Sequence, residues 1–227
     1  MKATRLLIAL LLLATVVGNA DAQYKRLSWD GCNPQVPDKT YNPVLSPQNY
    51  VLVVSAIGLT QPLIGHDSKV FIGPGLPDAW RFDDLGCQTS SGLMISSAGM
   101  TKAGCPPLTG GTPLEITAFQ YDPEAMNAQI RLAIAYDTLV PDPAQRYALW
   151  VLTFDHQYSV PGAGAPGLTC GGVEKGLLFD VSTDLALFSG AIQRPQTQPG
   201  DQQVTWNGGP FVPTVPATWG KVKGLYR

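Results

Sequence analysis

The feature that most constrains the fold is a series of short apolar runs, each four to eight residues long, separated by turn-forming residues. Residues 50–57 and 147–154 are apolar at both odd and even positions, which is typical of strands covered on both faces. Residues 130–136 instead alternate between large apolar side chains and smaller or charged ones, as in a strand with one buried face. The 24 glycines and 20 prolines supply the turns between runs. The pattern predicts strands.

The remaining runs extend this pattern and leave little room for helix. We predict further strands at residues 79–82, 93–97, 114–121, 177–181, 185–188 and 203–206. Helical signals are confined to Asp122-Pro123-Glu124, where a cap residue, a proline and an acidic first turn allow one or two helical turns. The fold class is therefore all-β: a single antiparallel β-sandwich, immunoglobulin-like or jelly-roll-like, with little helix.

The chain divides into three parts by composition. Residues 1–22 read as a signal peptide, residues 23–194 as the β-sandwich domain, and residues 195–227 as a segment rich in proline, glutamine and glycine. This last segment is predicted to be either an extended edge strand or a tail. A second glycine- and proline-rich stretch, residues 159–172, surrounds Cys170 and is predicted to be a long loop.

The N-terminus predicts export. Lys2 and Arg5 precede an apolar stretch over residues 6–17, and Ala20-Asp21-Ala22 provides the small residues that signal peptidase accepts, so cleavage is expected before Gln23. No later segment is apolar enough to span a membrane. We therefore expect a secreted protein of the extracellular space or the cell envelope.

Four cysteines would then meet an oxidising environment, where an even number indicates disulfide bonds. Cys87 and Cys105 flank a predicted strand and are preferred as a local pair, which leaves Cys32 to pair with Cys170. Four cysteines allow three pairings in all, and their spacing matches no zinc site.

Charge and histidine content exclude several functions. Fifteen basic and seventeen acidic residues give a net charge of −2, which lacks the excess of positive charge typical of nucleic-acid-binding proteins. Two histidines cannot form a site that needs several imidazoles. We expect no cofactor and no metal, with a structural calcium held by loop carboxylates as an alternative.

Several local patterns resemble a poorly characterised group of exported bacterial β-proteins. They are residues 27–32 (LSWDGC), residues 76–82 (LPDAWRF) followed by Gly86-Cys87, the strand around residues 130–136, and residues 218–227 (TWGKVKGLYR). The resemblance implies export and a β fold, but it implies no reaction and no site residues. The group is richer in cysteine around the position of Cys170, so this chain departs from it there.

Asp155 and His156 are the candidate catalytic residues, because a histidine near a carboxylate at the end of a strand is able to act as a general base. Adjacent strand residues point to opposite faces, however, and the chain has no G-x-S-x-G nucleophile motif. His66-Asp67-Ser68 contains the residue types of a hydrolytic triad, but a polar turn is the preferred interpretation.

Trp80, Trp206 and Trp219 lie in polar or turn-rich surroundings and are candidates for exposed binding residues, for example toward sugar rings. The leading hypothesis is an exported β-sandwich with a binding or structural role, not an enzyme, whose unknown extracellular ligand is a glycan or a protein. The alternatives are an exported hydrolase acting on polysaccharides or esters, and a carbohydrate-binding module.

Overall fold

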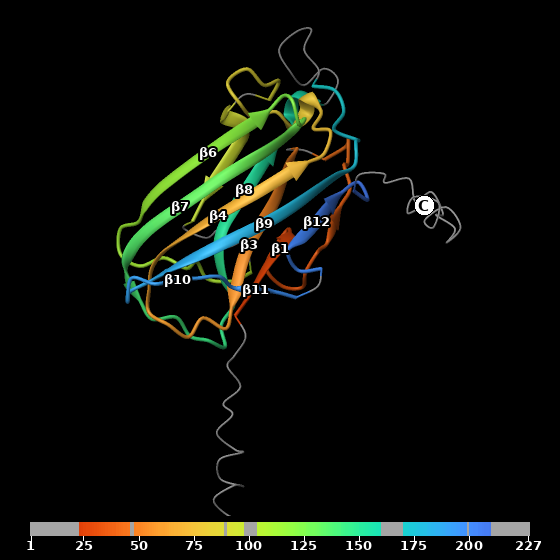
Figure 1. Ribbon diagram of the computed structural model, residues 1–227. Coiled ribbons are helices and arrows are strands. Elements are labelled where there is room, and N and C mark those ends of the chain that lie inside the picture. Colours follow the sequence, from red (N-terminus) through yellow and green to blue (C-terminus); the bar gives the residue numbers. More distant parts are fainter. Residues whose placement is uncertain are drawn as a thin grey trace, which may run out of the picture.

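Two β-sheets face each other and enclose the core of the protein (Figure 1). The computed structural model describes residues 23–45, 48–88, 90–97, 104–159, 170–198 and 200–209. Helix within these ranges is limited to the short 3-10 turns η1 (Asp78–Trp80), η2 (Ser90–Gly92) and η4 (Gln157–Ser159). Most strands pair antiparallel. The predicted antiparallel β-sandwich is thus confirmed.

Each sheet has a defined strand order. Sheet A has the order β11-β1-β3-β8-β5, formed by Gln196–Thr197, Tyr24–Trp29, Asn49–Ile57, Tyr147–Asp155 and Leu93–Ser96. Sheet B has the order β2-β12-β9-β4-β7-β6, formed by Asp38–Lys39, Gln203–Trp206, Leu177–Leu187, Leu63–Gly73, Asn127–Leu139 and Leu114–Asp122. The short β10 (Ile192–Gln193) pairs beside β9. The strands β6 and β11 lie at sheet edges.

Most predicted strands are present, and three local predictions are wrong. The runs predicted at residues 177–181 and 185–188 merge into the single strand β9, which ends at Leu187, before Phe188. Residues 79–82 do not form a strand, because Pro77 begins a 3-10 turn in which the Trp80 amide donates to the Pro77 carbonyl. Residues 123–126 form a hairpin turn instead of helix, and the Asp122 carboxylate accepts hydrogen bonds from two amides of that turn.

Aromatic rings fill the space between the sheets. Trp29 meets Phe179 edge to face at 5.2 Å between ring centroids and meets Trp206 at a tilt at 5.7 Å. The Trp29 Nε1–H donates to the Thr205 carbonyl, and the Trp206 Nε1–H donates to the Val173 carbonyl. Trp206 lies on β12, so the sandwich continues to that strand, beyond residue 194.

The outer face of sheet A is also covered. Cys32, Val53, Ala148 and Val151 form a second buried apolar cluster there, separate from the core between the sheets. Residues 106–108 run along β8, with the Leu108 amide donating to the Ala148 carbonyl. The strands β3 and β8 are therefore buried on both faces, as their apolar sequences predict.

The disulfide pairing differs from the predicted one. Cys32 bonds Cys105, with 6.1 Å between the Cα atoms, and Cys87 bonds Cys170, with 5.6 Å. The preference for a local Cys87–Cys105 pair is wrong because the two residues lie in different layers. Cys105 precedes the segment that crosses the outer face of β8, where Cys32 is buried, whereas Cys87 follows η1, whose Ala79 amide bonds the Gly171 carbonyl beside Cys170.

Some predictions fall on residues that the structure does not describe. The signal peptide at residues 1–22, most of the loop at residues 159–172, and Trp219 within residues 210–227 lie outside the described ranges. Within the described ranges, no helix is long and apolar enough to cross a bilayer.

Candidate functional site

The candidate catalytic pair at the end of β8 is split between two environments. His156 is fully buried, and its ring meets Trp80 at 4.4 Å between centroids. Burial lowers the pKa of His156 to about 3, so the imidazole is neutral at physiological pH. The carboxylate of Asp155 accepts the Gln157 amide instead of contacting His156. Gln88 is the hydrogen-bonding neighbour of the ring, at 3.5 Å from Nδ1.

The trio His66-Asp67-Ser68 is part of β4, not a turn. Strand alternation buries His66 and Ser68 and exposes Asp67, so the carboxylate cannot orient the imidazole. His66 Nε2 lies 3.3 Å from the Leu149 carbonyl, and Ser68 Oγ lies 3.0 Å from Thr183 Oγ1. Burial lowers the pKa of His66 to about 4. Within the described ranges, neither histidine has a carboxylate partner.

The expectation that Trp80 and Trp206 are exposed is wrong, because both side chains are fully buried in the core between the sheets. Their polar sequence neighbours belong to turns and to the outward positions of a short strand, whereas the rings themselves point inward. These two tryptophans therefore form no exposed platform for sugar rings.

Metal ligands do not gather in the described ranges either. No group of three or more His, Cys, Asp or Glu side chains there is arranged to hold a metal ion.

The most exposed regular element is β6, at the edge of sheet B (Figure 1). Among the described strands it pairs only with β7, so one edge of its nine-residue backbone has no strand partner. None of its nine residues is buried: seven are exposed, and Phe119 and Tyr121 are half-buried. Such an edge offers unpaired N–H and C=O groups to another strand.

The outer face beside this edge is apolar at one end. Leu114 and Ile116 are 68% and 66% exposed, and the register places Ala135 and Ala133 of β7 directly opposite them. The alanine side chains are short, so the two large aliphatic side chains project beyond their neighbours. Exposed apolar groups gathered in this way are typical of contact surfaces.

The other end of the same hairpin carries a polar pocket. Phe71, Gln129 and Gln120 form one row across β4, β7 and β6. They line a pocket of about 670 Å³ together with Asp122, Glu124 and Asn127. The charged groups of the pocket are carboxylates, so it favours a cationic group over an anionic one.

The sequence predicted the strand at residues 114–121 but not its role. No feature of the sequence LEITAFQY tells an edge strand from an internal one, because edge position depends on which strands pair elsewhere in the chain. The run of polar residues at Gln120, Asp122 and Glu124 is the only local sign of an open surface.

No protein-family model and no curated protein matches the chain. Several solved structures are similar to it, among them the three that follow. A type II cohesin domain from the cellulosome of Acetivibrio cellulolyticus is 11% identical, with a TM-score of 0.42, over 87% of this chain and 99% of that one. The major pilin subunit BcpA of Bacillus cereus is 10% identical, with a TM-score of 0.35, over 81% of this chain and 39% of that one. A non-cellulosomal cohesin from Archaeoglobus fulgidus is 7% identical, with a TM-score of 0.34, over 81% and 89%. The β-sandwich assignment rests on the strand pairing, not on these likenesses.

Proposed function

We propose that this chain is an exported β-sandwich module that binds a partner polypeptide, and that it does so by accepting an extended segment at the free edge of β6. The single observation that carries the proposal is the open nine-residue edge of β6 beside the exposed Leu114 and Ile116. Main-chain hydrogen bonds along such an edge provide affinity, and pockets for alternate side chains provide specificity.

Export is supported by the predicted signal peptide and by the two disulfide bonds, which persist in oxidising compartments. A binding role, as opposed to a catalytic one, is supported by the burial of both histidines in apolar surroundings. We therefore place the module in the extracellular space or the cell envelope.

The charges of the edge indicate what kind of segment fits. Glu115 and Asp122 lie in β6 and Glu124 follows in the turn, whereas β6 contains no lysine or arginine. Natural edge strands are commonly protected by lysine or proline, and β6 has neither. The partner segment is accordingly expected to alternate basic and apolar residues, with a basic side chain at the β6 end of the pocket, beside Gln120 and Asp122.

A peptide titration tests the proposal. A synthetic nine-residue peptide that alternates lysine and valine is added to the isotope-labelled chain, and amide chemical shifts are followed by NMR. The expected result is a saturable shift of β6 amides that disappears when the peptide is N-methylated at alternate residues, because N-methylation removes backbone donors.

The chain offers a matched pair of variants for this test. Ile116→Lys places a charge on the β6 surface, and Ile192→Lys places the same charge on β10, where Ile192 is 63% exposed. Binding is expected to be lost in the first and retained in the second. Equal loss in both variants, or shifts that lie away from β6, contradicts the proposal. Removal of residues 210–227 is a further control, because that segment contains three basic residues.

A further inference from the structure

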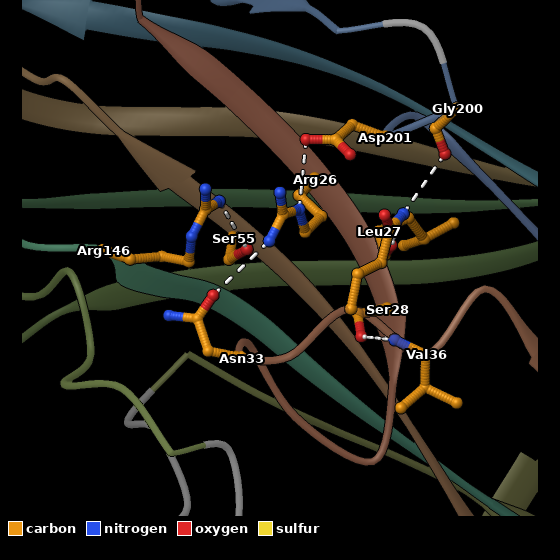
Figure 2. Close-up of polar contacts among 10 residues, drawn as sticks. Arg26, Leu27, Ser28, Asn33, Val36, Ser55, Arg146, Gly200 and Asp201 are labelled. Carbon is orange, nitrogen blue, oxygen red and sulfur yellow. Dashed lines mark hydrogen bonds and ion pairs between the residues drawn. The ribbon is translucent and has the colours of Figure 1, made fainter.

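Two arginines meet on the outer face of sheet A, far from β6. Arg26 belongs to β1, and Arg146 immediately precedes β8. Register places Arg26 opposite Ser55, and the Arg146 guanidinium donates to the Ser55 hydroxyl at 3.4 Å. Figure 2 shows the two arginine side chains converging beside Ser55.

The positive charge of this cluster exceeds the negative charge. The Arg26 Nε–H bonds the Asp201 carboxylate at 3.0 Å, which neutralises one guanidinium. Arg146 has no carboxylate oxygen within ion-pair distance among the described residues. Because an arginine stays charged in proteins, one net positive charge remains.

The chain itself supplies no second carboxylate. Every Asp and Glu lies within the described ranges except Asp21, which is part of the predicted signal peptide. The undescribed segments therefore contain no acidic side chain that could fold over Arg146 in the mature protein. Asp201 is therefore the only acidic side chain of the mature chain known to act on the two arginines, and it is shared between them.

Most donors of the two guanidinium groups are also unused. Arg146 is only 9% exposed, yet the single hydrogen bond to Ser55 engages one of its five N–H groups. Arg26 donates to Asp201 and, at 3.4 Å, to Asn33. Burial lowers the pKa of Arg146 and the nearby positive charge of Arg26 lowers it further, whereas the carboxylate of Asp201 acts in the opposite direction. No guanidinium nitrogen of Arg146 is both fully buried and without a partner, so its remaining donors reach solvent and are open to a ligand.

The walls around the two arginines are fixed by the backbone. The Leu27 amide donates to the Asp201 carbonyl at 2.7 Å, and the Gln35 side-chain amide bridges the carbonyls of Leu27 and Gly200. The Val36 amide donates to the Ser28 hydroxyl. The loops around Ser55 are thus fixed by hydrogen bonds to β1, so a ligand would not have to order these loops when it binds.

We propose that Arg146 and Arg26, together with Ser55 and Asn33, form a binding site for one carboxylate group of a ligand. A planar guanidinium matches a carboxylate through two parallel hydrogen bonds, and the single excess charge matches a monoanion. Asn33 is exposed, so the approach to the site runs past that residue. The site is independent of the proposed edge interaction at β6.

The experiment follows the arginine Nε–H signals of the ¹⁵N-labelled chain by NMR during a titration with sodium acetate, at an ionic strength held constant with sodium chloride. The expected result is a saturable shift of the Arg146 and Arg26 signals and no shift of Arg131, an exposed arginine on β7. Unchanged Arg146 and Arg26 signals overturn the proposal, as does sulfate binding as tightly as acetate. This titration uses the unaltered protein and needs no variant.

Two further measurements sharpen the test. In Arg146→Met the affinity for acetate is expected to fall about tenfold or more, because a charge-assisted contact is lost; an unchanged affinity contradicts the proposal. A blocked Gly-Glu-Gly peptide, compared with its Gly-Gln-Gly control, separates a side-chain carboxylate from a small acid. If the glutamate peptide shifts the same signals, the natural ligand is a polypeptide side chain, whereas shifts with acetate alone assign a small carboxylic acid.

Discussion

The strands β8 and β6 are both nine residues long and both end in aspartate, yet they have opposite environments. β8 lies between β3 and β5, and its outer face is covered by the cluster that includes Cys32 and Val53. β6 pairs with β7 alone among the described strands. The burial of a strand in this protein therefore depends on its position in the sheet and on the loops that cover it, and only partly on its own residues.

The largest change in the free energy of unfolding is expected when the same negative charge is placed on the outer face of β8 and of β6. Val151 and Ile116 both face outward from their sheets, but Val151 is 1% exposed and Ile116 is 66% exposed. Val151→Asp is expected to lower the free energy of unfolding by about 4 kcal/mol or more, because it buries an unpaired carboxylate. Ile116→Asp is expected to change it by less than about 0.5 kcal/mol. Urea unfolding measures both, and similar losses in the two variants would refute the comparison.

The second prediction concerns the Cys32–Cys105 disulfide, which is expected to hold the apolar cluster in place over the outer face of β8. Its two cysteines are 73 residues apart, and on the chain-entropy model their replacement by alanine costs about 4 kcal/mol. Replacement of Cys87 and Cys170, 83 residues apart, costs nearly the same on that model. Hydrogen exchange distinguishes the pairs: amides of β3 and β8 are expected to lose more protection in the Cys32/Cys105 variant. Equal loss in both variants would mean that the cover does not depend on this bond.

The third prediction is that the free energy of unfolding depends on pH, because two histidines are buried in the core between the sheets. Burial lowers the pKa of His66 to about 4 and of His156 to about 3, below the value of about 6.5 in an unfolded chain. Between these values the unfolded state binds protons that the folded state does not, so stability falls as the pH drops below about 6.5. Each histidine is expected to lower the free energy of unfolding by about 2 kcal/mol between pH 7 and pH 5.

Urea unfolding at the two pH values measures this loss, and His66→Asn should reduce it by about half. The window lies above the range in which carboxyl groups ordinarily titrate, so it isolates the histidines. If stability were equal at pH 5 and pH 7, the two imidazoles would have to be open to solvent.

The sequence pattern predicted strands well where it was not interrupted by polar core residues. Residues 50–57 and 147–154 are apolar on both phases and form β3 and β8. The long strand β4 was missed because His66 and Ser68 occupy its core-facing positions, where a pattern search expects apolar residues. Gly65 added a second false signal, since it looks like a break but lies at a register shift where a Cβ atom would meet the Ile134 carbonyl oxygen at 2.4 Å.

The candidate sites were less predictable than the strands, for a physical reason. Trp80 and Trp206 have polar sequence neighbours, but only the tertiary fold decides that their rings point inward. Arg26 and Arg146 are 120 residues apart in the chain and meet because β1 and β8 both flank β3. The sequence contains one hint, a basic residue directly before the doubly buried β8. Neither the free edge of β6 nor the arginine pair is a local property of the sequence.

The last prediction involves the smallest change in the free energy of unfolding. It concerns amide hydrogen exchange along β6, which tests directly whether the edge of this strand is open. In an antiparallel strand, alternate amides point toward opposite neighbours, so every second amide of β6 donates to β7 and the others point to the free edge. Hydrogen exchange along β6 is expected to alternate between slow and fast with a period of two residues. Amides in the middle of β8, between β3 and β5, are expected to be slow throughout. Uniformly slow exchange along β6 would mean that another part of the chain already occupies the edge, and the proposed docking of a partner segment there would have to be abandoned. If the alternation is observed, addition of the lysine–valine peptide should slow the fast set alone, because only those amides face the incoming strand.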